Sequence, residues 1–257
     1  MSIDQRAIVD SSARIGNNVT IGAFSVIGAN VQIDDDSWIG PHVVINGPTS
    51  IGKENRIFQF ASIGEIPQDK KFHGESSTLE IGDRNTIREF VTINRGTEDG
   101  GGITRIGNDN WLMAYIHIAH DCIIGNAVTM ANAASLAGHV SVEDYAILGG
   151  FTLVHQFCTI GSFSFCGMGS AISKDVLPYL MVSGNPAQTH GLNVEGLKRR
   201  NTDKETMQAL REAYRIIYRS GHTVKEAKLH LMGLAEQFEP VAHMVAFLDK
   251  SERGILR

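Results

Sequence analysis

The stretch from Ile15 to Ile45 decides the fold, and it reads IGNNVTIGAFSVIGANVQIDDDSWIGPHVVI. An aliphatic residue returns at every sixth position, and the same spacing reaches back to Ile3 and forward to Ile63. A period of six is neither the 3.6 of an amphipathic helix nor the alternation of a long strand. The slots of this run are Ile3, Val9, Ile15, Ile21, Ile27, Ile33, Ile39, Ile45, Ile51, Ile57 and Ile63.

Two interruptions divide the repeat. After the first it resumes in the same register from Ile81 to Ile93, and after the second it restarts one residue out of phase at Ile106. Gly often follows the aliphatic residue, and a small or β-branched residue stands four positions after it. The slots of the last run are Ile106, Leu112, Ile118, Ile124, Met130, Leu136, Val142, Leu148, Val154, Ile160, Cys166 and Ile172.

This spacing predicts a short strand followed by a tight turn, with three such units closing a triangular coil. The aliphatic side chain fills the narrow interior, and Gly or Asn takes backbone angles that bulkier residues avoid. Each coil pairs with the next at about 4.8 Å. We therefore predict a parallel β-helix from Ile3 to about Val176.

Composition limits the class of protein. The chain has 257 residues, 42% of them hydrophobic, and a formal net charge of −5, which argues against a general nucleic-acid binder. The N-terminus lacks the layout of a secretion signal, and no apolar run reaches the roughly 18 residues of a membrane span. Cys122, Cys158 and Cys166 form no CxxC pair. We expect a soluble cytoplasmic protein with reduced thiols and no integral membrane segment.

The interruptions predict loops at residues 65–80 and 94–105. The second carries Gly100–Gly102 but lacks the Lys-Ser/Thr of a P-loop, so a flexible loop is favoured over a phosphate cradle. Long loops on a regular scaffold are usually functional. Residues 1–186 are predicted to form the β-helix domain that carries both loops.

Residues 187–257 change in character and predict a small helical domain. The segment Thr202–Glu205 resembles a capping box before a helix that ends near Gly221, and residues 224–237 and 241–249 predict two more helices. The basic residues here form either a solvated face or a dock for an acidic partner or a phosphorylated substrate. They are Lys198, Arg199, Arg200, Arg211, Arg215 and Arg219.

Counting in eighteens places several polar residues together. One coil after His120 comes Gly138, and one further coil leads to Gln156. We expect four histidines to share this corner of the coil on three successive layers, because parallel coils stack residues of equal phase. The cluster consists of His117, His120, Gly138, His139, His155 and Gln156.

Three interpretations of the cluster remain open. The histidines are structural, or they bind zinc as in the β-helical carbonic anhydrases, or one of them is a general base that deprotonates an attacking hydroxyl. Asp121 could orient His120, although neighbours on a strand point to opposite faces. The cysteines occupy slots expected to face inward, which argues against a nucleophilic role.

Six strings carry a resemblance to a known family, and they occur in order along the chain. They are FASIGE (60–65), EIGDRNTIRE (80–89), HIAHDC (117–122), LAGHVSV (136–142), VHQFC (154–158) and NVEGLKRR (193–200). The whole chain resembles the UDP-N-acetylglucosamine O-acyltransferases of lipid A biosynthesis, which are hexapeptide-repeat transferases. The resemblance implies a left-handed β-helix and a homotrimer with active sites between subunits, where residues 65–80 reach a neighbour.

The resemblance also implies a reaction. A (R)-3-hydroxyacyl group would pass from the phosphopantetheine thioester of acyl carrier protein to the 3-hydroxyl of UDP-N-acetylglucosamine, without a metal or cofactor. His120 matches the general base, and the backbone N–H of Gly138 matches the oxyanion donor. Positions that match substrate contacts are Gln68, Asp69, Lys71, His117, His139, His155, Gln156, Asn193, Glu195, Arg199 and Arg200.

Two residues depart from the family's pattern. Met168 stands where the long-chain enzymes have Gly, at a position that acts as a ruler for the acyl tail. Because the Met side chain would fill that groove, we expect a preference for a medium chain of about 10 carbons. Asn94 stands where related sequences often have His, so a nucleotide contact is expected to differ.

Rival functions remain. A related sugar-nucleotide N-acyltransferase is separated from this activity by no residue in the sequence. A zinc carbonic anhydrase on the same scaffold is the other rival, and the helical C-terminus counts against it. A purely structural β-helix would leave the histidine cluster and the EGLKRR segment unexplained.

Overall fold

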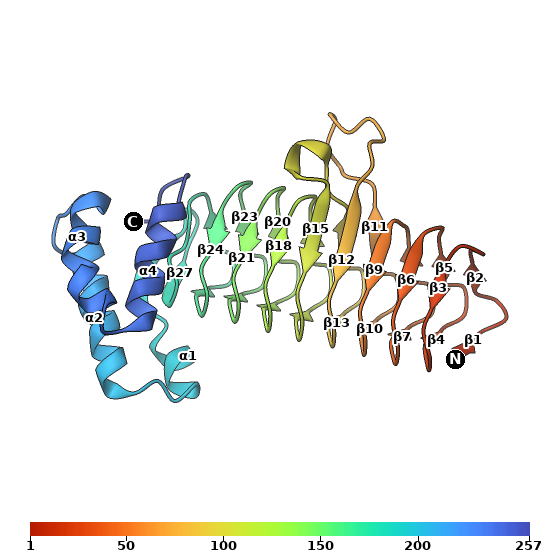
Figure 1. Ribbon diagram of the computed structural model, residues 1–257, viewed down its shortest axis with the longest axis horizontal. Coiled ribbons are helices and arrows are strands. Elements are labelled where there is room, and N and C mark those ends of the chain that lie inside the picture. Colours follow the sequence, from red (N-terminus) through yellow and green to blue (C-terminus); the bar gives the residue numbers. More distant parts are fainter.

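A computed structural model describes the whole chain, from Met1 to Arg257. The strands wind into a long three-sided prism, and the helices lie together at its C-terminal end (Figure 1). The predicted parallel β-helix is confirmed, because every strand from β1 to β23 pairs in parallel with the strand three places further along the chain. No helix has the length and apolar character that a bilayer span requires.

Three sheets make the sides of the prism, and we call them the first, second and third sheets. The first contains β1 (Ser2–Ile3), β4 (Thr20–Ile21), β7 (Trp38–Ile39), β10 (Arg56–Ile57), β13 (Thr86–Ile87), β16 (Trp111–Leu112), β19 (Thr129–Met130), β22 (Ile147–Leu148), β25 (Phe165–Cys166), β27 (Leu180–Ser183) and the antiparallel β28 (Gln188–Leu192). The second contains β2 (Ile8–Val9), β5 (Val26–Ile27), β8 (Val44–Ile45), β11 (Ser62–Glu65), β14 (Thr92–Asn94), β17 (His117–Ile118), β20 (Ser135–Leu136), β23 (Leu153–Val154) and β26 (Ala171–Ile172). The third contains β3 (Arg14–Ile15), β6 (Val31–Ile33), β9 (Thr49–Ile51), β12 (Thr78–Ile81), β15 (Ile103–Ile106), β18 (Ile123–Ile124), β21 (Ser141–Val142) and β24 (Thr159–Ile160).

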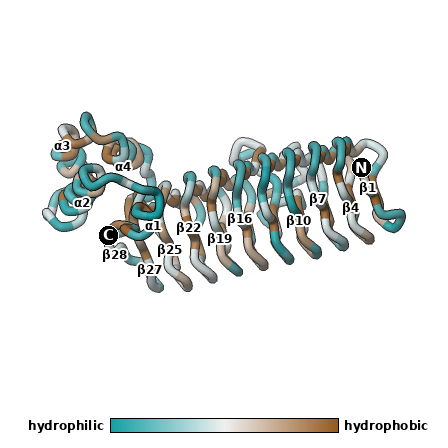
Figure 2. The backbone as a smooth tube through the Cα atoms, turned by 90° about the horizontal axis from the view of Figure 1, so that it is seen from below, coloured by the Kyte–Doolittle hydropathy of each residue, from teal (hydrophilic) through white to brown (hydrophobic).

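The core is a column of the predicted aliphatic residues. From Ile21 onward these slots are buried, and they form one hydrophobic cluster with the apolar residues that stand four positions later, such as Val43 and Val128. Hydrophobic and hydrophilic positions therefore recur along the coils (Figure 2). The first coil is less covered, and Ile3 remains 37% exposed because no earlier coil lies on it.

The turns correct one expectation about glycine. The left-handed backbone falls three residues after the aliphatic slot, on residues as large as Phe24 (φ 60°) and His139 (φ 61°). The Gly directly after the slot is needed for another reason, because the next coil lies against it. A Cβ at Gly22 would meet the backbone N of Pro41 at 2.5 Å, so close approach between coils excludes a side chain there.

The two interruptions keep the sheets in register. Ile57 pairs with Ile87 and Ile87 pairs with Leu112, so the excursions add twelve and seven residues to an eighteen-residue coil. Seven is one more than a repeat, which explains the shift in phase. The excursions occupy 66–77 and 95–102, shorter than the predicted loops, because β11, β12, β14 and β15 run on into their ends. Both leave from the same edge of the prism (Figure 1).

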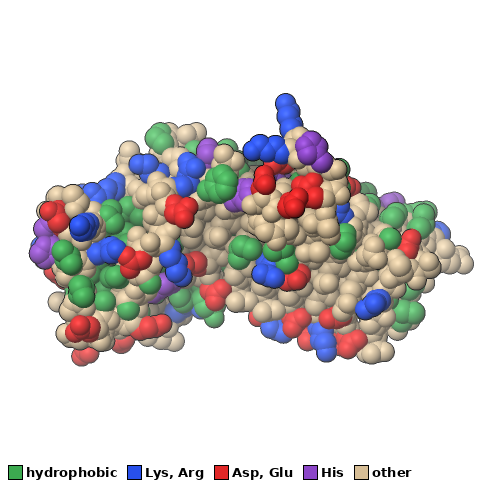
Figure 3. Space-filling model, turned by 45° about the horizontal axis from the view of Figure 1, so that its top comes forward, with side chains coloured by type: hydrophobic (Ala, Val, Ile, Leu, Met, Phe, Trp, Pro, Cys, Tyr) green, Lys and Arg blue, Asp and Glu red, His purple; other side chains and the backbone are tan.

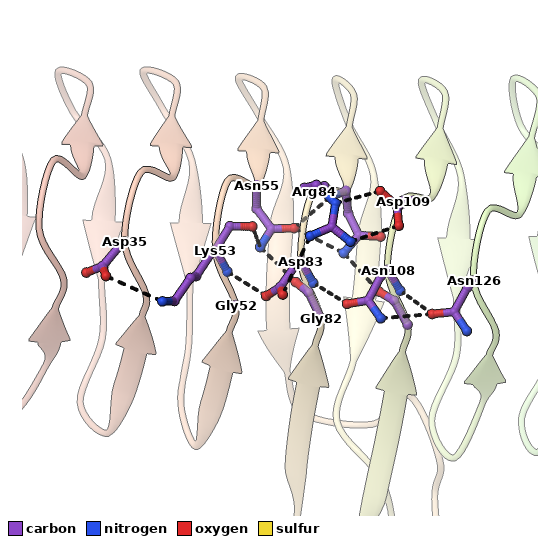
Figure 4. A network of polar contacts seen from close by, with 12 residues as sticks. Asp35, Gly52, Lys53, Asn55, Gly82, Asp83, Arg84, Asn108, Asp109 and Asn126 are labelled. Atoms are coloured by element: carbon purple, nitrogen blue, oxygen red, sulfur yellow. Dashed lines mark hydrogen bonds and ion pairs between the residues drawn. The ribbon is translucent and has the colours of Figure 1, made fainter.

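Polar ladders join the coils at another edge. The carboxylate of Asp83 accepts from Lys53 N at 2.8 Å, and Asn108 Oδ1 in turn accepts from Asp83 N at 2.7 Å (Figure 4). A second ladder lies deeper, where buried Asn85 donates to Asn55 Oδ1 at 3.0 Å and accepts from Asn110 N at 2.9 Å. These side chains satisfy backbone N–H groups that the tight turns leave unpaired.

Four helices follow the β27–β28 hairpin, which spans the predicted domain boundary at residue 186. They are α1 (Val194–Arg199), α2 (Lys204–Tyr218), α3 (Val224–Ala235) and α4 (Glu239–Lys250). The short α1 was not predicted. The predicted capping box at Thr202–Glu205 is wrong, because Asp203 is the N-cap of α2 and accepts from Thr206 N. The actual capping box joins Thr223 and Glu226 at the start of α3.

Candidate active site

His120 lies in the turn between β17 and β18, at the edge where the second sheet meets the third. We call this edge the His120 corner. Asp121 takes the left-handed conformation there (φ 60°), which turns its side chain toward the same side as His120 instead of the opposite face. Nδ1 of His120 consequently lies 2.7 Å from Oδ2 of Asp121. The pair is largely buried, with side-chain exposures of 14% and 1%.

Gly138 stacks directly on His120, as counting in eighteens predicted. The register pairs His117 with Ser135 and Ser135 with Leu153, which places Gly138 and Gln156 on the next two coils at the same corner. A Cβ at Gly138 would lie 2.5 Å from Cε1 of His120. The N–H of Gly138 donates to no other atom of the chain.

His139 and His117 flank the central pair. The His139 ring stands edge-on to His120 with centroids 5.1 Å apart, and it stacks on Phe157 at 4.4 Å. Nδ1 of His117 lies 2.7 Å from the hydroxyl of Thr92. Burial lowers the pKa of His139, and burial with His120 nearby lowers the pKa of His117, so both imidazoles are neutral at neutral pH.

A metal-binding site is the rival interpretation of the histidine cluster. His120, Asp121 and His139 offer ligand atoms within 4.8 Å of one another. The carboxylate of Asp121 is already engaged, however, by His120 and by the backbone N–H and hydroxyl of Thr97. A metal ion on these oxygens would displace hydrogen-bond donors that are buried with it, so the residues fit a hydrogen-bonded pair better.

The excursion 66–77 brings three predicted residues to the same corner. Asp69 and Lys71 line a hollow together with Thr97 and Asp99 of the second excursion, and Gln68 is exposed beside it. Acidic, basic and histidine side chains gather on and beside this protrusion (Figure 3). Asp69 and Asp99 act electrostatically on His139, which shows how near the loops lie to the histidine cluster.

Two more of the predicted substrate residues lie at the His120 corner, and so does Asn94, which is buried. His155 and Gln156 are exposed on the coil beyond Gly138, and His155 Nδ1 lies 3.1 Å from the carbonyl of Gln156. Asn94 is only 3% exposed, and its amide donates to Ile66 O at 2.8 Å. In this chain the Asn94 side chain therefore holds the start of the excursion 66–77 by a hydrogen bond.

The residues predicted to bind the nucleotide and phosphate lie at a different edge. The guanidinium of Arg200 lies 3.8 Å from the ring centre of Tyr145 and 5.2 Å from that of Phe163, where the third sheet meets the first. We call this edge the Arg200 corner. Asn193 is the N-cap of α1 and donates to Phe163 O at 2.9 Å. Glu195 and Arg199 are exposed on α1, and Glu195 pairs with Lys198.

Met168 lies at the remaining edge, where the first sheet meets the second, and the residue is 78% exposed. The predicted residues thus occupy three different edges of one chain. Three further residues at these edges were not predicted from the sequence, namely Tyr145, Phe163 and Thr97. Tyr145 and Phe163 could have been found from their eighteen-residue spacing, whereas Thr97 depends on a loop conformation that no pattern indicates.

The cysteines are inert, as their slots predicted. Burial raises the pKa of Cys122 and Cys166 to about 12, and that of Cys158 to about 11. The thiolate, which is the nucleophilic form, is therefore scarce at neutral pH. All three thiols are free and buried.

Comparisons with known proteins agree with this architecture. Residues 12–47 match the family model described as bacterial transferase hexapeptide (six repeats), and residues 175–256 match the model described as UDP-N-acetylglucosamine O-acyltransferase, domain 2. This repeat defines the chain as a hexapeptide-repeat transferase, whose β-helix is left-handed.

Full-length relatives narrow the class. An acyl-(acyl-carrier-protein)–UDP-N-acetylglucosamine O-acyltransferase of Alkalilimnicola ehrlichii is 56% identical, and one of Halorhodospira halophila is 55% identical, each over 99% of both chains. A crystal structure of UDP-N-acetylglucosamine O-acyltransferase from Moraxella catarrhalis is 47% identical, covers 100% of both chains and superposes with a TM-score of 0.98. The chain belongs to the UDP-N-acetylglucosamine O-acyltransferase family, and it is an acyltransferase.

Proposed function

We propose that this chain transfers a (R)-3-hydroxyacyl group from acyl carrier protein to the 3-hydroxyl of UDP-N-acetylglucosamine, the first step of lipid A biosynthesis. The relatives named above are acyltransferases of these two substrates. The observation that carries the proposal is the placement of His120. One ring nitrogen lies 2.7 Å from a buried carboxylate, and the ring packs against the backbone of Gly138, whose N–H donates to no other atom of the chain.

His120 serves as the general base in this proposal. The Asp121 carboxylate accepts from Nδ1–H of His120, which leaves Nε2 unprotonated and able to take the proton of the sugar hydroxyl. The hydroxyl oxygen attacks the thioester carbonyl, and Asp121 stabilises the imidazolium that forms. The imidazolium then gives its proton to the departing thiol of phosphopantetheine, so the base is regenerated without a metal or cofactor.

Gly138 serves as the oxyanion donor. Its N–H has no acceptor within the chain and lies on the coil next to His120. A donor aimed at the developing negative charge stabilises the tetrahedral intermediate, and such a donor typically contributes about 3–4 kcal/mol. Neutral His139 and His117, exposed His155 and Gln156, and loop residues Gln68, Asp69 and Lys71 surround this point and would position the substrates.

A homotrimer would complete the site. Within one chain the Arg200 corner and Met168 lie on different edges from His120, so a second copy must bring them to the same cleft. A row of exposed aromatic rings on the Met168 edge supports such an interface, because contiguous exposed apolar side chains mark contact surfaces. Its exposed members are Phe24, Phe60, Phe90 and Tyr115. Asn193, Glu195, Arg199 and Arg200 would then hold the nucleotide and the phosphate of the carrier's prosthetic group.

Acyl transfer by His120→Ala tests the proposal. With acyl carrier protein thioester and UDP-N-acetylglucosamine, we expect a rate about 1000-fold below wild type, the scale of general-base catalysis. The exposed His230 on α3 supplies the control, and His230→Ala is expected to retain full activity. Undiminished turnover by His120→Ala would remove the proposed base.

The same assay separates the rival functions. An ester product is cleaved by mild alkali, whereas an amide product would identify an N-acyltransferase. A zinc carbonic anhydrase would contain bound zinc and would hydrate CO2, so metal analysis of the purified protein tests that rival function. We expect an alkali-labile product and turnover that survives treatment with a chelator.

A further inference from the structure

The second excursion closes over the carboxylate of Asp121. Thr97 lies in this loop and donates twice: its backbone N–H to Oδ1 at 2.8 Å and its hydroxyl to Oδ2 at 2.6 Å. Oδ2 is also the oxygen that faces Nδ1 of His120. Thr97 is 4% exposed and Asp121 is 6% exposed, so water does not compete for these positions.

The glycine run makes this approach possible. A Cβ at Gly100 would lie 2.0 Å from the carboxyl carbon of Asp121, so only glycine fits against the carboxylate. Gly101 and Gly102 then take left-handed angles (φ 92° and 79°), and Gly102 N donates to Thr97 O at 2.7 Å. The run is therefore a hydrogen-bonded turn around Asp121.

The main chain of Asp121 is held in place, but its carboxylate needs further hydrogen bonds to fix its orientation. Its backbone N–H donates to the hydroxyl of Thr104 at 2.8 Å, which holds the main chain, but the carboxylate could still rotate about its last bond. Two donors from one residue, one on each oxygen, define the plane of the carboxylate. That plane sets the direction in which the His120 ring is held.

We propose that Thr97 is a positioning residue, which aligns the Asp121 carboxylate so that His120 keeps its Nδ1–H tautomer and presents Nε2 to the acceptor hydroxyl. This inference rests on the proposed function of His120 and assigns to the Gly-rich loop a role in catalysis. Thr97 is almost fully buried and donates two hydrogen bonds to Asp121, so it acts through the carboxylate and not on the substrate.

Three threonine variants test the role. Thr97→Val keeps the size of the side chain and removes the hydroxyl, which donates to Asp121 and accepts from Gly100 N at 3.3 Å. Thr97→Ser restores both hydrogen bonds. Thr129→Val makes the same change on β19 of the first sheet, where the hydroxyl makes no hydrogen bond within the chain. We expect Thr97→Val to lower kcat about ten-fold with KM nearly unchanged, as for one lost hydrogen bond to a charged group. Thr97→Ser and Thr129→Val should match wild type.

A spectroscopic measurement distinguishes positioning from general damage. In protein labelled with ¹⁵N-histidine, the ring-nitrogen shifts of His120 report its tautomer, and His120→Ala assigns the signal. We expect the Nδ1–H tautomer in wild type and in Thr97→Ser, and a mixture in Thr97→Val. Gly100→Ala, whose Cβ would displace the loop from Asp121, should produce the same mixture by an independent route.

The role of Thr97 and the proposed function of His120 can be refuted independently of each other. If His120→Ala were inactive while Thr97→Val kept wild-type kcat or a wild-type tautomer, the role of Thr97 would be overturned and the base would stand. If His120→Ala stayed active, the proposed function would fall, whatever the spectra of Thr97→Val showed.

Discussion

The imidazole of His120 packs on the backbone of Gly138, and a Cβ at Gly138 would lie 2.7 Å from Nε2 and 2.5 Å from Cε1 of His120. Gly138 is not among the residues with left-handed backbone, so alanine suits its main chain. The glycine is required by the ring above it. Contact between two successive coils thus determines the residue type at the proposed oxyanion donor.

Replacing Gly138 by alanine should separate activity from stability. The added methyl group must push the His120 ring away from Asp121, and we expect acyl transfer to fall at least about 100-fold, as when a catalytic donor and base lose alignment. Thermal unfolding should change little because the backbone is compatible. Gly233→Ala is the control, since a Cβ there meets nothing within 4 Å. Normal turnover by Gly138→Ala would contradict the assigned site.

Substitution of Met168 by glycine should lengthen the preferred acyl chain. If Met168 closes a groove formed with a neighbouring copy, removing its side chain opens room for several more methylene groups, each worth about 0.8 kcal/mol of burial. Competition between 3-hydroxyacyl thioesters of about 10 to 14 carbons measures the change. An unchanged preference would show that the exposed Met168 is not the ruler.

The eighteen-residue period predicted which residues stack, but it could not predict which side chains touch. Gly138 and Gln156 lie above His120 because the strands repeat without insertion between them. The contact between His120 and Asp121 depends on the left-handed backbone of Asp121, and many residue types adopt that conformation in this chain. Residue type alone therefore does not indicate it.

The loops and the C-terminus set a further limit on prediction. The position of Thr97 depends on how 95–102 folds back, and nothing periodic describes such a segment. Arg200 lies over Tyr145 because the β27–β28 hairpin and α1 return along the prism, a path that hydrophobic spacing does not record. The basic segment was found in the sequence, whereas the edge on which it lies was not.

The buried asparagine ladder should be sensitive to a single truncation. Asn85→Ala removes the acceptor of Asn110 N and the donor to Gly107 O, whereas Asn55 Oδ1 keeps the backbone N–H of residue 85. We expect a loss of about 2–4 kcal/mol in the free energy of unfolding, the cost of leaving two such groups unpaired. Asn17→Ala, at an exposed bond to Asp35, is the control. Chemical denaturation at one fixed protein concentration measures both variants, and equal losses would refute the argument.

The contact between α4 and the β-helix should depend on pH through His243. Nε2 of His243 lies 3.1 Å from Glu143, and Nδ1 lies 3.3 Å from the hydroxyl of Ser162 and 3.2 Å from that of Tyr179. The hydrogen bond to Glu143 raises the pKa of His243, with Glu239 adding to the effect, while burial and Lys250 oppose it. A histidine whose pKa is raised on folding stabilises the folded state fully below the unfolded value, 6.5, and this contribution is lost as pH rises through the folded value.

His243→Gln therefore should lower the unfolding temperature more at pH 6 than at pH 9. Glutamine keeps a polar group near Ser162 and Tyr179 but cannot carry the charge that pairs with Glu143. The pair is about one-third exposed, so solvent screening reduces its contribution, and we expect a loss of about 2–4 °C at pH 6, which corresponds to roughly 1 kcal/mol. Thermal melts across this pH range measure the difference. His230→Gln, at an exposed position on α3, is the control. A deficit that stayed constant from pH 6 to pH 9 would mean that the charge on His243 does not hold α4 to the prism.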